Sequence, residues 1–215
     1  MNYYIITGAN SELAKAVSTK LREDNNKVLL ASRRKLWCAE NISSDDFLDR
    51  TTIPDTKFKD AKALMESNFL TLYGVIKYLL PLQLKRGGGK IVAFSCNSVK
   101  YNYPGMSAFT SAKAAVESLV KITANEWAHE NIIINAFSLP SIKTDAVLRN
   151  KPDYVAEDLI TPKELSECII NEVDNFSKYT NGNIISIIKH SDTFFGKGYY
   201  ERNKYSLNFK VGLTI

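Results

Sequence analysis

A lysine, a phenylalanine and a cysteine stand at spacings that could place them around one site. Phe109 and Lys113 are four residues apart in an Ala-rich segment, so a helix would stack them on one face. Cys96 ends an apolar run, residues 91–96, that is typical of a buried strand. An amine beside a thiol can activate it as a nucleophile, which makes covalent chemistry at Cys96 one hypothesis. No histidine is placed nearby, and a cysteine on an apolar strand more often belongs to the core.

The N-terminal segment predicts a unit that faces the phosphates of a nucleotide. An apolar strand at Tyr3–Thr7 is followed at once by Gly8, then by apolar residues at helical spacing, then by a second apolar run at Lys27–Ala31. This order predicts a parallel βαβ unit over residues 3–31, the first half of a Rossmann-type fold. In such units the turn after the first strand and the helix N-terminus face a pyrophosphate.

The end of the second strand bears on the choice of cofactor. Ser32 and Arg33 follow it, and no carboxylate is present there to bind an adenosine ribose hydroxyl. A guanidinium and a hydroxyl suit a 2′-phosphate, so this position favours NADP(H) over NAD(H). The alternative is that Arg33 and Arg34 only solvate a loop.

Local patterns predict the remaining elements. Residues 60–85 have helical periodicity that Pro81 is expected to bend or end. Residues 131–138 are predicted to form a buried parallel strand, and Asn183–Ile188 the final core strand. Thr161 and Glu164, with Pro162 between them, indicate a capping box at the start of the last helix.

Several of these motifs together resemble the short-chain dehydrogenase/reductase family. Residues 7–14 are similar to the family's Thr-Gly-x-x-x-Gly-x-Gly, but Glu12 and Ala14 replace the second and third glycines. Residues 109–113 resemble its Tyr-x-x-x-Lys, with Phe109 at the Tyr, and Cys96 stands where the family has a Ser thirteen residues earlier. Residues 134–144 resemble Val-Asn-x-x-x-Pro-Gly-x-Ile-x-Thr, with Leu139-Pro140 at the Pro-Gly.

The resemblance implies one α/β domain over residues 1–215, with a Rossmann-like, doubly wound, mostly parallel sheet and helices on both faces. Its core covers 1–189, and 190–215 form a C-terminal extension in which Tyr205–Val211 predicts an extra strand or hairpin. The sheet is shortened between the second strand and the helix that carries Asn68. Residues 35–59 are too few for the family's elements there, and Asn-Asn-Ala-Gly is absent. Lys35–Ala39 could be a strand, which would be antiparallel, irregular or displaced. At least one helix-strand unit is therefore lost.

The resemblance also implies roles for individual residues. Lys113, Asn68, Cys96 and Phe109 fall at catalytic positions, where Asn68 would hold a water in the proton relay through its backbone carbonyl. Phe109 cannot replace the proton-donating Tyr, and Cys96 offers only a weak S–H donor in place of the Ser. The implied cofactor-binding residues are Thr7, Gly8, Asn10, Ser11, Leu13, Ser32, Arg33, Lys113, Ile142 and Thr144.

These departures indicate a catalytically impaired member, a pseudoenzyme, that acts as a partner, regulatory or scaffold protein. The alternative is an active NADP(H)-dependent carbonyl oxidoreductase with a non-standard proton donor, such as Tyr101, Tyr103 or water. Glu12 would repel a bound pyrophosphate unless its carboxylate points to solvent.

Composition and charge limit the other classes of protein to which this chain could belong. The net charge of +5 is spread along the chain without a nucleic-acid-binding motif, and three scattered cysteines suggest neither a disulfide framework nor a metal site. No apolar stretch reaches the roughly 18 residues of a membrane span, and the first residues lack a secretory signal. We expect a cytoplasmic protein that binds no nucleic acid or membrane, and the resemblance implies a homo-oligomer.

Overall fold

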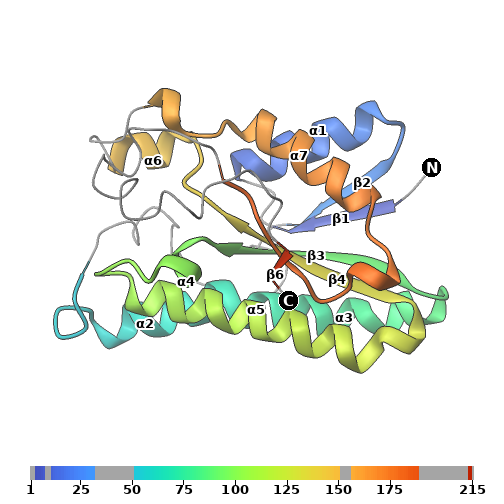
Figure 1. Ribbon diagram of the computed structural model, residues 1–215, viewed down its shortest axis with the longest axis horizontal. Coiled ribbons are helices and arrows are strands. Elements are labelled where there is room, and N and C mark those ends of the chain that lie inside the picture. The colour runs from blue at the N-terminus through green and yellow to red at the C-terminus, as the bar shows by residue number, and fades with distance from the viewer. Residues whose placement is uncertain (1–2, 8–10, 32–50, 151–155, 189–212, 215) are drawn as a thin grey trace.

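The computed structural model describes residues 3–7, 11–31, 51–150, 156–188 and 213–214, which form three layers (Figure 1). The strands lie in the middle layer, with helices on both faces. One face is covered by α1 (Glu12–Glu23) and α7 (Pro162–Asp174), and the other by α2 (Phe58–Met65), α3 (Thr71–Lys85) and α5 (Ser107–Trp127). This arrangement confirms the predicted Rossmann-like α/β fold.

The strands pair as two separate sheets. In one, β1 (Tyr3–Thr7) and β2 (Lys27–Ala31) run parallel, with Tyr3 opposite Lys27. In the other, β3 (Gly89–Cys96), β4 (Ile132–Leu139) and β5 (Ile184–Ser186) run parallel in that order. The last strand, β6 (Leu213–Thr214), pairs antiparallel with β5, so this end of the predicted extension covers the β5 edge.

The β1–α1–β2 unit forms because its apolar residues meet on one side. Tyr4 and Ile6 of β1 pack against Val17 and Leu21 of α1, and Ile170 of α7 joins the same cluster. Ser11 begins the helix as its N-cap, since its Oγ accepts a hydrogen bond from Ala14 N at 3.1 Å. The parallel βαβ unit predicted over residues 3–31 is confirmed.

Strand β4 is the centre of the core, and all eight of its residues are buried. Ile132, Ile134 and Ala136 pack in the cluster that contains residues of α3 and α5. Ile133, Phe137 and Leu139 point the other way, into the cluster that contains residues of α7. This alternation is expected of a strand buried on both faces.

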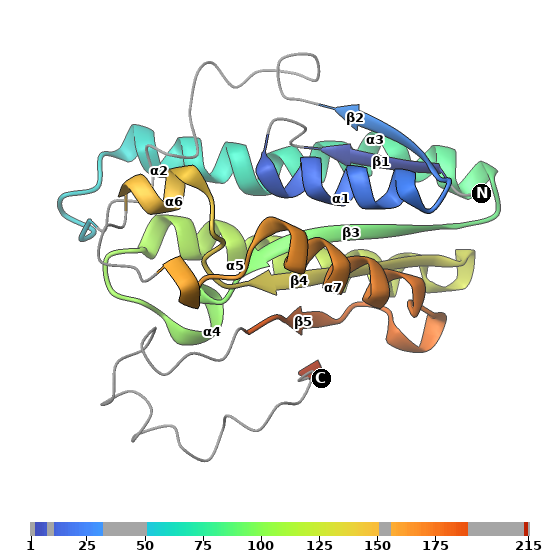
Figure 2. The same cartoon turned by 90° about the horizontal axis from the view of Figure 1, so that it is seen from above.

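The break between the two sheets lies between β1 and β3. No pairing among the described residues joins these strands, which Figure 2 shows facing each other with no arrow between them. In the doubly wound strand order 3-2-1-4-5-6, the first strand pairs with the fourth. β2 ends at Ala31 and α2 begins only at Phe58, and the described part of this connection is turn. No strand of the described residues therefore occupies the place of the fourth strand, between β1 and β3.

Partly exposed apolar side chains lie on the strands next to this break. Ile91, Val92 and Phe94 of β3 are only half-buried, although the neighbouring β4 is buried throughout. Ile5 and Leu29, which are paired across β1 and β2, are 48% and 62% exposed. Their face of the β1–β2 sheet is the one opposite α1.

Two details differ from the predicted helices and strands. Pro81 lies inside α3 and does not end it, because Ile76 and Leu80 before it and Leu84 after it all pack in the core. The final strand is shorter than predicted, at three residues. The proposed strands at Lys35–Ala39 and Tyr205–Val211 lie outside the described residues.

The capping box of the last helix is confirmed. Glu164 N donates to Thr161 Oγ1 at 3.2 Å, and Thr161 N donates to Glu164 Oε2 at 2.7 Å. The shorter helical segments are α4 (Ser98–Tyr101), α6 (Asp145–Asn150) and 3₁₀ turns at Ala128–Glu130, Ala156–Asp158 and Lys178–Thr180. None of the helices in the described part of the chain is long and apolar enough to cross a bilayer.

Candidate active site

The predicted catalytic positions meet where β3 ends and α4 and α5 begin. Cys96 is the last residue of β3, opposite Leu139 at the end of β4. Its thiol is free and half-buried, and its Sγ accepts a hydrogen bond from Ser98 N at 3.4 Å. The carboxyl ends of parallel strands are where ligands bind in open α/β sheets. Cys96 therefore lies at the edge where a substrate would be expected.

Lys113 reaches from α5 to this edge. Its Nζ donates to the backbone carbonyl of Phe94 at 3.1 Å and lies 5.7 Å from the centroid of the Phe109 ring. The second distance confirms that Phe109 and Lys113 stack on one helix face. Burial lowers the pKa of the Lys113 ammonium, and the interaction with Cys96 acts in the opposite direction.

The ring of Phe109 occupies the position beside the lysine where the resemblance places a phenol. A phenyl ring can hold a cation against its face but cannot donate or accept a proton. Around Lys113, the described contacts are thus a carbonyl, a ring and a thiol. The proton donor of the family's reaction has no counterpart at this position.

Asn68 lies in an irregular part of the helix before the site. Residues Glu66–Leu70 form a π-helical turn between α2 and α3, and this turn packs against α5. A π turn shifts the helical hydrogen bonds, so carbonyls near it need other donors. Asn68 Nδ2 supplies one to Leu64 O at 2.9 Å. A π-helical turn thus surrounds Asn68, and its role in a proton relay stays a prediction.

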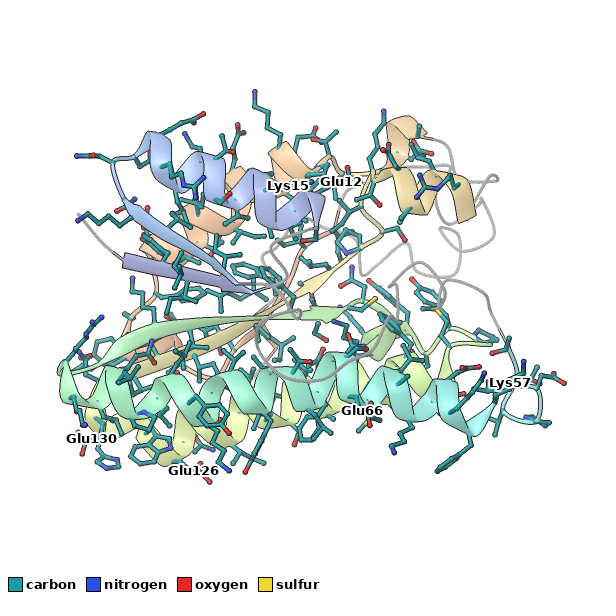
Figure 3. All side chains as sticks on the ribbon, turned by 180° about the vertical axis from the view of Figure 1, so that it is seen from behind. Glu12, Lys15, Lys57, Glu66, Glu126 and Glu130 are labelled. Atoms are coloured by element: carbon teal, nitrogen blue, oxygen red, sulfur yellow. The ribbon has the colours of Figure 1, made fainter. Side chains whose placement is uncertain are left out.

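Glu12 contacts the segment that follows β4. Its Oε1 accepts a hydrogen bond from Asp145 N, the first residue of α6, at 3.1 Å. Figure 3 labels Glu12 at the start of α1, on the side of the molecule where α6 lies. The carboxylate is exposed and also stands at the N-terminus of α1, where the helix dipole favours a negative charge. It therefore links the expected phosphate-binding turn to the loop after β4.

Ile142 and Thr144 shape that same loop. Ile142 forms a parallel bridge with Ile160, and its side chain packs against the α7 core cluster. Thr144 Oγ1 accepts a hydrogen bond from Val147 N at 3.2 Å, so this hydroxyl caps the first turn of α6. These bonds hold the loop near the carboxyl end of β4, and the roles of Ile142 and Thr144 at a nicotinamide stay predictions.

The other predicted cofactor residues are described only in part. Ser11 uses its hydroxyl to cap α1, and the side chain of Leu13 packs between two core clusters. Thr7 is the last residue of β1, and its side chain is not described. Gly8, Asn10, Ser32 and Arg33 lie outside the described residues.

The sequence did not identify Asn97, which is buried directly after Cys96. Its Nδ2 donates to Ile187 O at 3.1 Å, and its Oδ1 accepts from Ser138 Oγ at 2.9 Å. Its own N–H donates to Leu139 O at 2.9 Å. One amide thus joins the ends of β3 and β4 to the segment after β5. The sequence signal that could have identified Asn97 was the presence of an Asn directly after an apolar strand.

Metal binding finds no support in the part of the chain that the structure describes. It contains no group of three or more His, Cys, Asp or Glu side chains that could hold a metal ion. Burial and the nearby Glu172 raise the pKa of the Cys168 thiol, which makes it a poor nucleophile.

Comparison with known proteins places the chain in a family. The sequence model of short chain dehydrogenases matches residues 47–154. The 3-oxoacyl-[acyl-carrier-protein] reductase of Thermotoga maritima is 26% identical over 61% of this chain and 56% of its own length. A tropinone reductase homolog of Arabidopsis thaliana is 31% identical over 58% of this chain and 42% of its own length. The chain thus spans about half the length of these relatives.

Solved structures show the same fold. A putative NAD(P) dependent gluconate 5-dehydrogenase from Beutenbergia cavernae, with bound NADP, has a TM-score of 0.74 at 15% identity and covers 87% of this chain and 95% of its own. The 3-ketoacyl-(acyl-carrier-protein) reductase of Brucella melitensis, complexed with NADH, has a TM-score of 0.72 at 14% identity and covers 87% of this chain and 97% of its own. With the match of the family model over half of its residues, the chain belongs to the short chain dehydrogenases.

Proposed function

We propose that this protein is a catalytically impaired short chain dehydrogenase, whose nucleotide-shaped cleft serves a partner, regulatory or scaffold role. The observation that carries the proposal is the packing of Lys113 against the Phe109 ring and the Phe94 carbonyl. In the family's chemistry the lysine lowers the pKa of a tyrosine that protonates the carbonyl oxygen. Loss of one positioned acid-base group costs roughly 10²–10⁴ in rate. Cys96 also offers a weaker hydrogen bond than the serine expected there.

The cofactor we propose is NADP(H), bound in preference to NAD(H). The proposal rests on Ser32 and Arg33, which suit a 2′-phosphate by charge and donor geometry. Structures with the same fold hold NADP in one case and NADH in another, so the fold accommodates either cofactor. Arg33 is therefore the residue whose replacement tests the preference.

A binding titration and an activity assay test this proposal together. We expect NADPH to bind more tightly than NADH by calorimetry, and Arg33→Ala to weaken NADPH selectively. NAD(P)H oxidation over a panel of aldehydes and ketones should stay at background, because the ring that lies beside Lys113 is that of Phe109, which has no proton to donate. Robust turnover that is lost in Lys113→Ala would contradict the proposal.

The second candidate function is carbonyl reduction with a different proton donor. Tyr101 and Tyr103 favour it, because they lie at the end of α4 and just after it, and their ring centroids are 5.8 Å apart. Both side chains are half-buried at the same end of the sheet as Cys96. If either one donates the proton, Tyr101→Phe or Tyr103→Phe will lower a measurable rate. An unchanged rate in both variants would leave only water.

We also propose a homo-oligomer. Large apolar side chains are exposed on the helices of the α3 and α5 layer, which supports contact with another subunit. They are Leu70, Tyr73, Tyr78, Leu82 and Ile122. Sedimentation at increasing protein concentration measures the oligomeric state directly.

Glu12→Gln should raise the affinity for NADPH by no more than about twofold. The substitution removes one negative charge from the turn that faces the pyrophosphate, but this carboxylate is exposed and solvent screens it. The amide oxygen of Gln can still accept the hydrogen bond from Asp145 N, so the contact between α1 and α6 is kept. Calorimetric titration of both proteins with NADPH measures the change.

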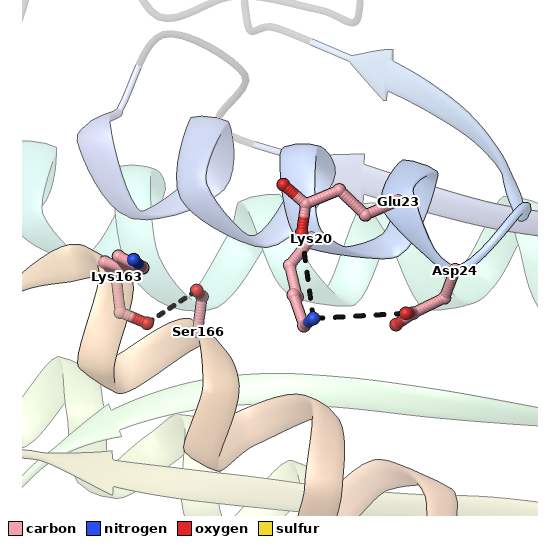
Figure 4. A network of polar contacts seen from close by, with 5 residues as sticks. All are labelled: Lys20, Glu23, Asp24, Lys163 and Ser166. Carbon is pink, nitrogen blue, oxygen red and sulfur yellow. Dashed lines mark hydrogen bonds and ion pairs between the residues drawn. The ribbon is translucent and has the colours of Figure 1, made fainter.

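Glu23→Gln is the matched control. Glu23 lies at the other end of α1, where its carboxylate is 3.6 Å from Lys20 Nζ (Figure 4). Removal of this charge should leave NADPH affinity unchanged. Equal affinities in wild type and Glu12→Gln would mean that the Glu12 carboxylate does not oppose the cofactor.

A further inference from the structure

The amine of Lys113 lacks the partners that usually keep a lysine charged. Its Nζ has one hydrogen-bond acceptor among the described residues, the carbonyl of Phe94 at 3.1 Å. No carboxylate of the described residues forms an ion pair with it. Glu117 lies one helical turn further along α5, but its Oε1 accepts a hydrogen bond from Ser95 Oγ at 2.6 Å. Among the described residues, the titratable group that interacts with Lys113 is Cys96, from β3.

The surroundings of this amine favour its neutral form. The side chain is half-buried between α5 and β3, and the Phe109 ring lies beside it. Burial of the ammonium lowers its pKa from the ordinary value of a lysine. A neutral amine has a free electron pair and is a nucleophile, whereas an ammonium is not. The side chain is half-buried and not fully buried, as uptake of a small molecule at this lysine requires.

We propose that Lys113 is a covalent binding site for small aldehydes, which it takes up as an imine. The nitrogen attacks the carbonyl carbon and forms a carbinolamine. Loss of water then leaves a carbon–nitrogen double bond, with the carbonyl oxygen and both amine hydrogens leaving as that water. The step needs no oxidant, reductant or nucleotide. The apolar ring of Phe109 favours an aldehyde with an aliphatic or aromatic body.

Propanal with sodium cyanoborohydride tests the proposal on the full chain. The reagent reduces the imine to a stable secondary amine, and peptide mass spectrometry then locates the modified lysine. At neutral pH we expect Lys113 to be modified at least about tenfold faster than Lys121, which is exposed on the same helix. As the pH is lowered, modification of Lys113 should persist to a lower pH than that of Lys121.

Three controls make the result decisive. Lys113→Arg keeps the positive charge but cannot form an imine, so the fast site should disappear while the melting temperature stays similar. Cys96→Ser should keep the fast site, because the stable secondary amine forms on the nitrogen of Lys113 and not on the thiol. In urea the difference between Lys113 and Lys121 should vanish. Modification of Lys113 no faster than Lys121 in the folded protein, or a fast site that survives in Lys113→Arg, would overturn the proposal. Neither result depends on whether the protein binds or oxidises NADPH.

Discussion

Phe109→Tyr combined with Cys96→Ser is expected to give NADPH-dependent carbonyl reduction about 10² times above the wild-type background. The first substitution places a phenol where the Phe109 ring now lies 5.7 Å from Lys113 Nζ, measured to the centroid. The second supplies a stronger hydrogen-bond donor at the end of β3. We expect a gain at the lower end of the roughly 10²–10⁴ range for an acid-base group, because Glu12 remains in the phosphate turn. NADPH oxidation with an aldehyde panel measures it.

Two further variants separate catalysis from folding in this experiment. Phe109→Tyr alone should give a smaller gain, because the carbonyl would be poorly oriented. Adding Lys113→Met to the double variant should remove the gain, because a thioether cannot donate the hydrogen bond that Lys113 is expected to give to the cofactor ribose. A double variant that binds NADPH but stays at background would show that more than the two hydroxyls is missing from the site.

Asn97→Ala is expected to lower the free energy of unfolding by about 2–4 kcal/mol. The substitution leaves Ile187 O and the buried Ser138 hydroxyl without their partner, and both groups are away from water. An unpaired buried polar group costs about 1–3 kcal/mol. Urea unfolding followed by circular dichroism measures the change, and the slope with urea should stay as in wild type.

Ser138→Ala is the comparison for this prediction. It removes one of the two side-chain bonds of Asn97 but leaves the bond to Ile187 O, so its effect should be smaller. Asn97→Ala and Ser138→Ala share the bond between their side chains, and the double variant should therefore be more stable than the sum of the single effects implies. Strictly additive changes in the free energy of unfolding would contradict the proposed coupling of Asn97 and Ser138.

Local sequence signals predicted most elements of this fold. The apolar run of β4 and the capping box at Thr161 each depend on neighbouring residues, and both were placed correctly. The stacking of Phe109 and Lys113 was likewise predictable, since four residues make about one helical turn. Pro81 was harder, because its effect depends on how strongly the residues around it are held in the core.

The features that sequence reasoning missed depend on contacts between distant segments. Asn97 contacts Ser138 and Ile187, which are 41 and 90 residues away in the chain. The contact of Glu12 with Asp145 spans 133 residues. A missing strand can be inferred from a short connection, but the position of the break becomes evident only when the pairing of every strand is known. The charge of Glu12 was predictable, whereas its partner was not.

The break between β1 and β3 affects how the molecule can open. In a continuous sheet, backbone hydrogen bonds would tie the β1–α1–β2 unit to the rest. Among the described residues, that unit contacts the rest of the molecule chiefly through the packing of α1 against α7 (Figure 4). Side-chain contacts yield more readily than a strand ladder, so we expect hydrogen exchange to report a lower opening energy for this unit than for β3, β4 and β5. The half of the molecule expected to hold the nucleotide would then loosen while β3, β4 and β5 stay folded.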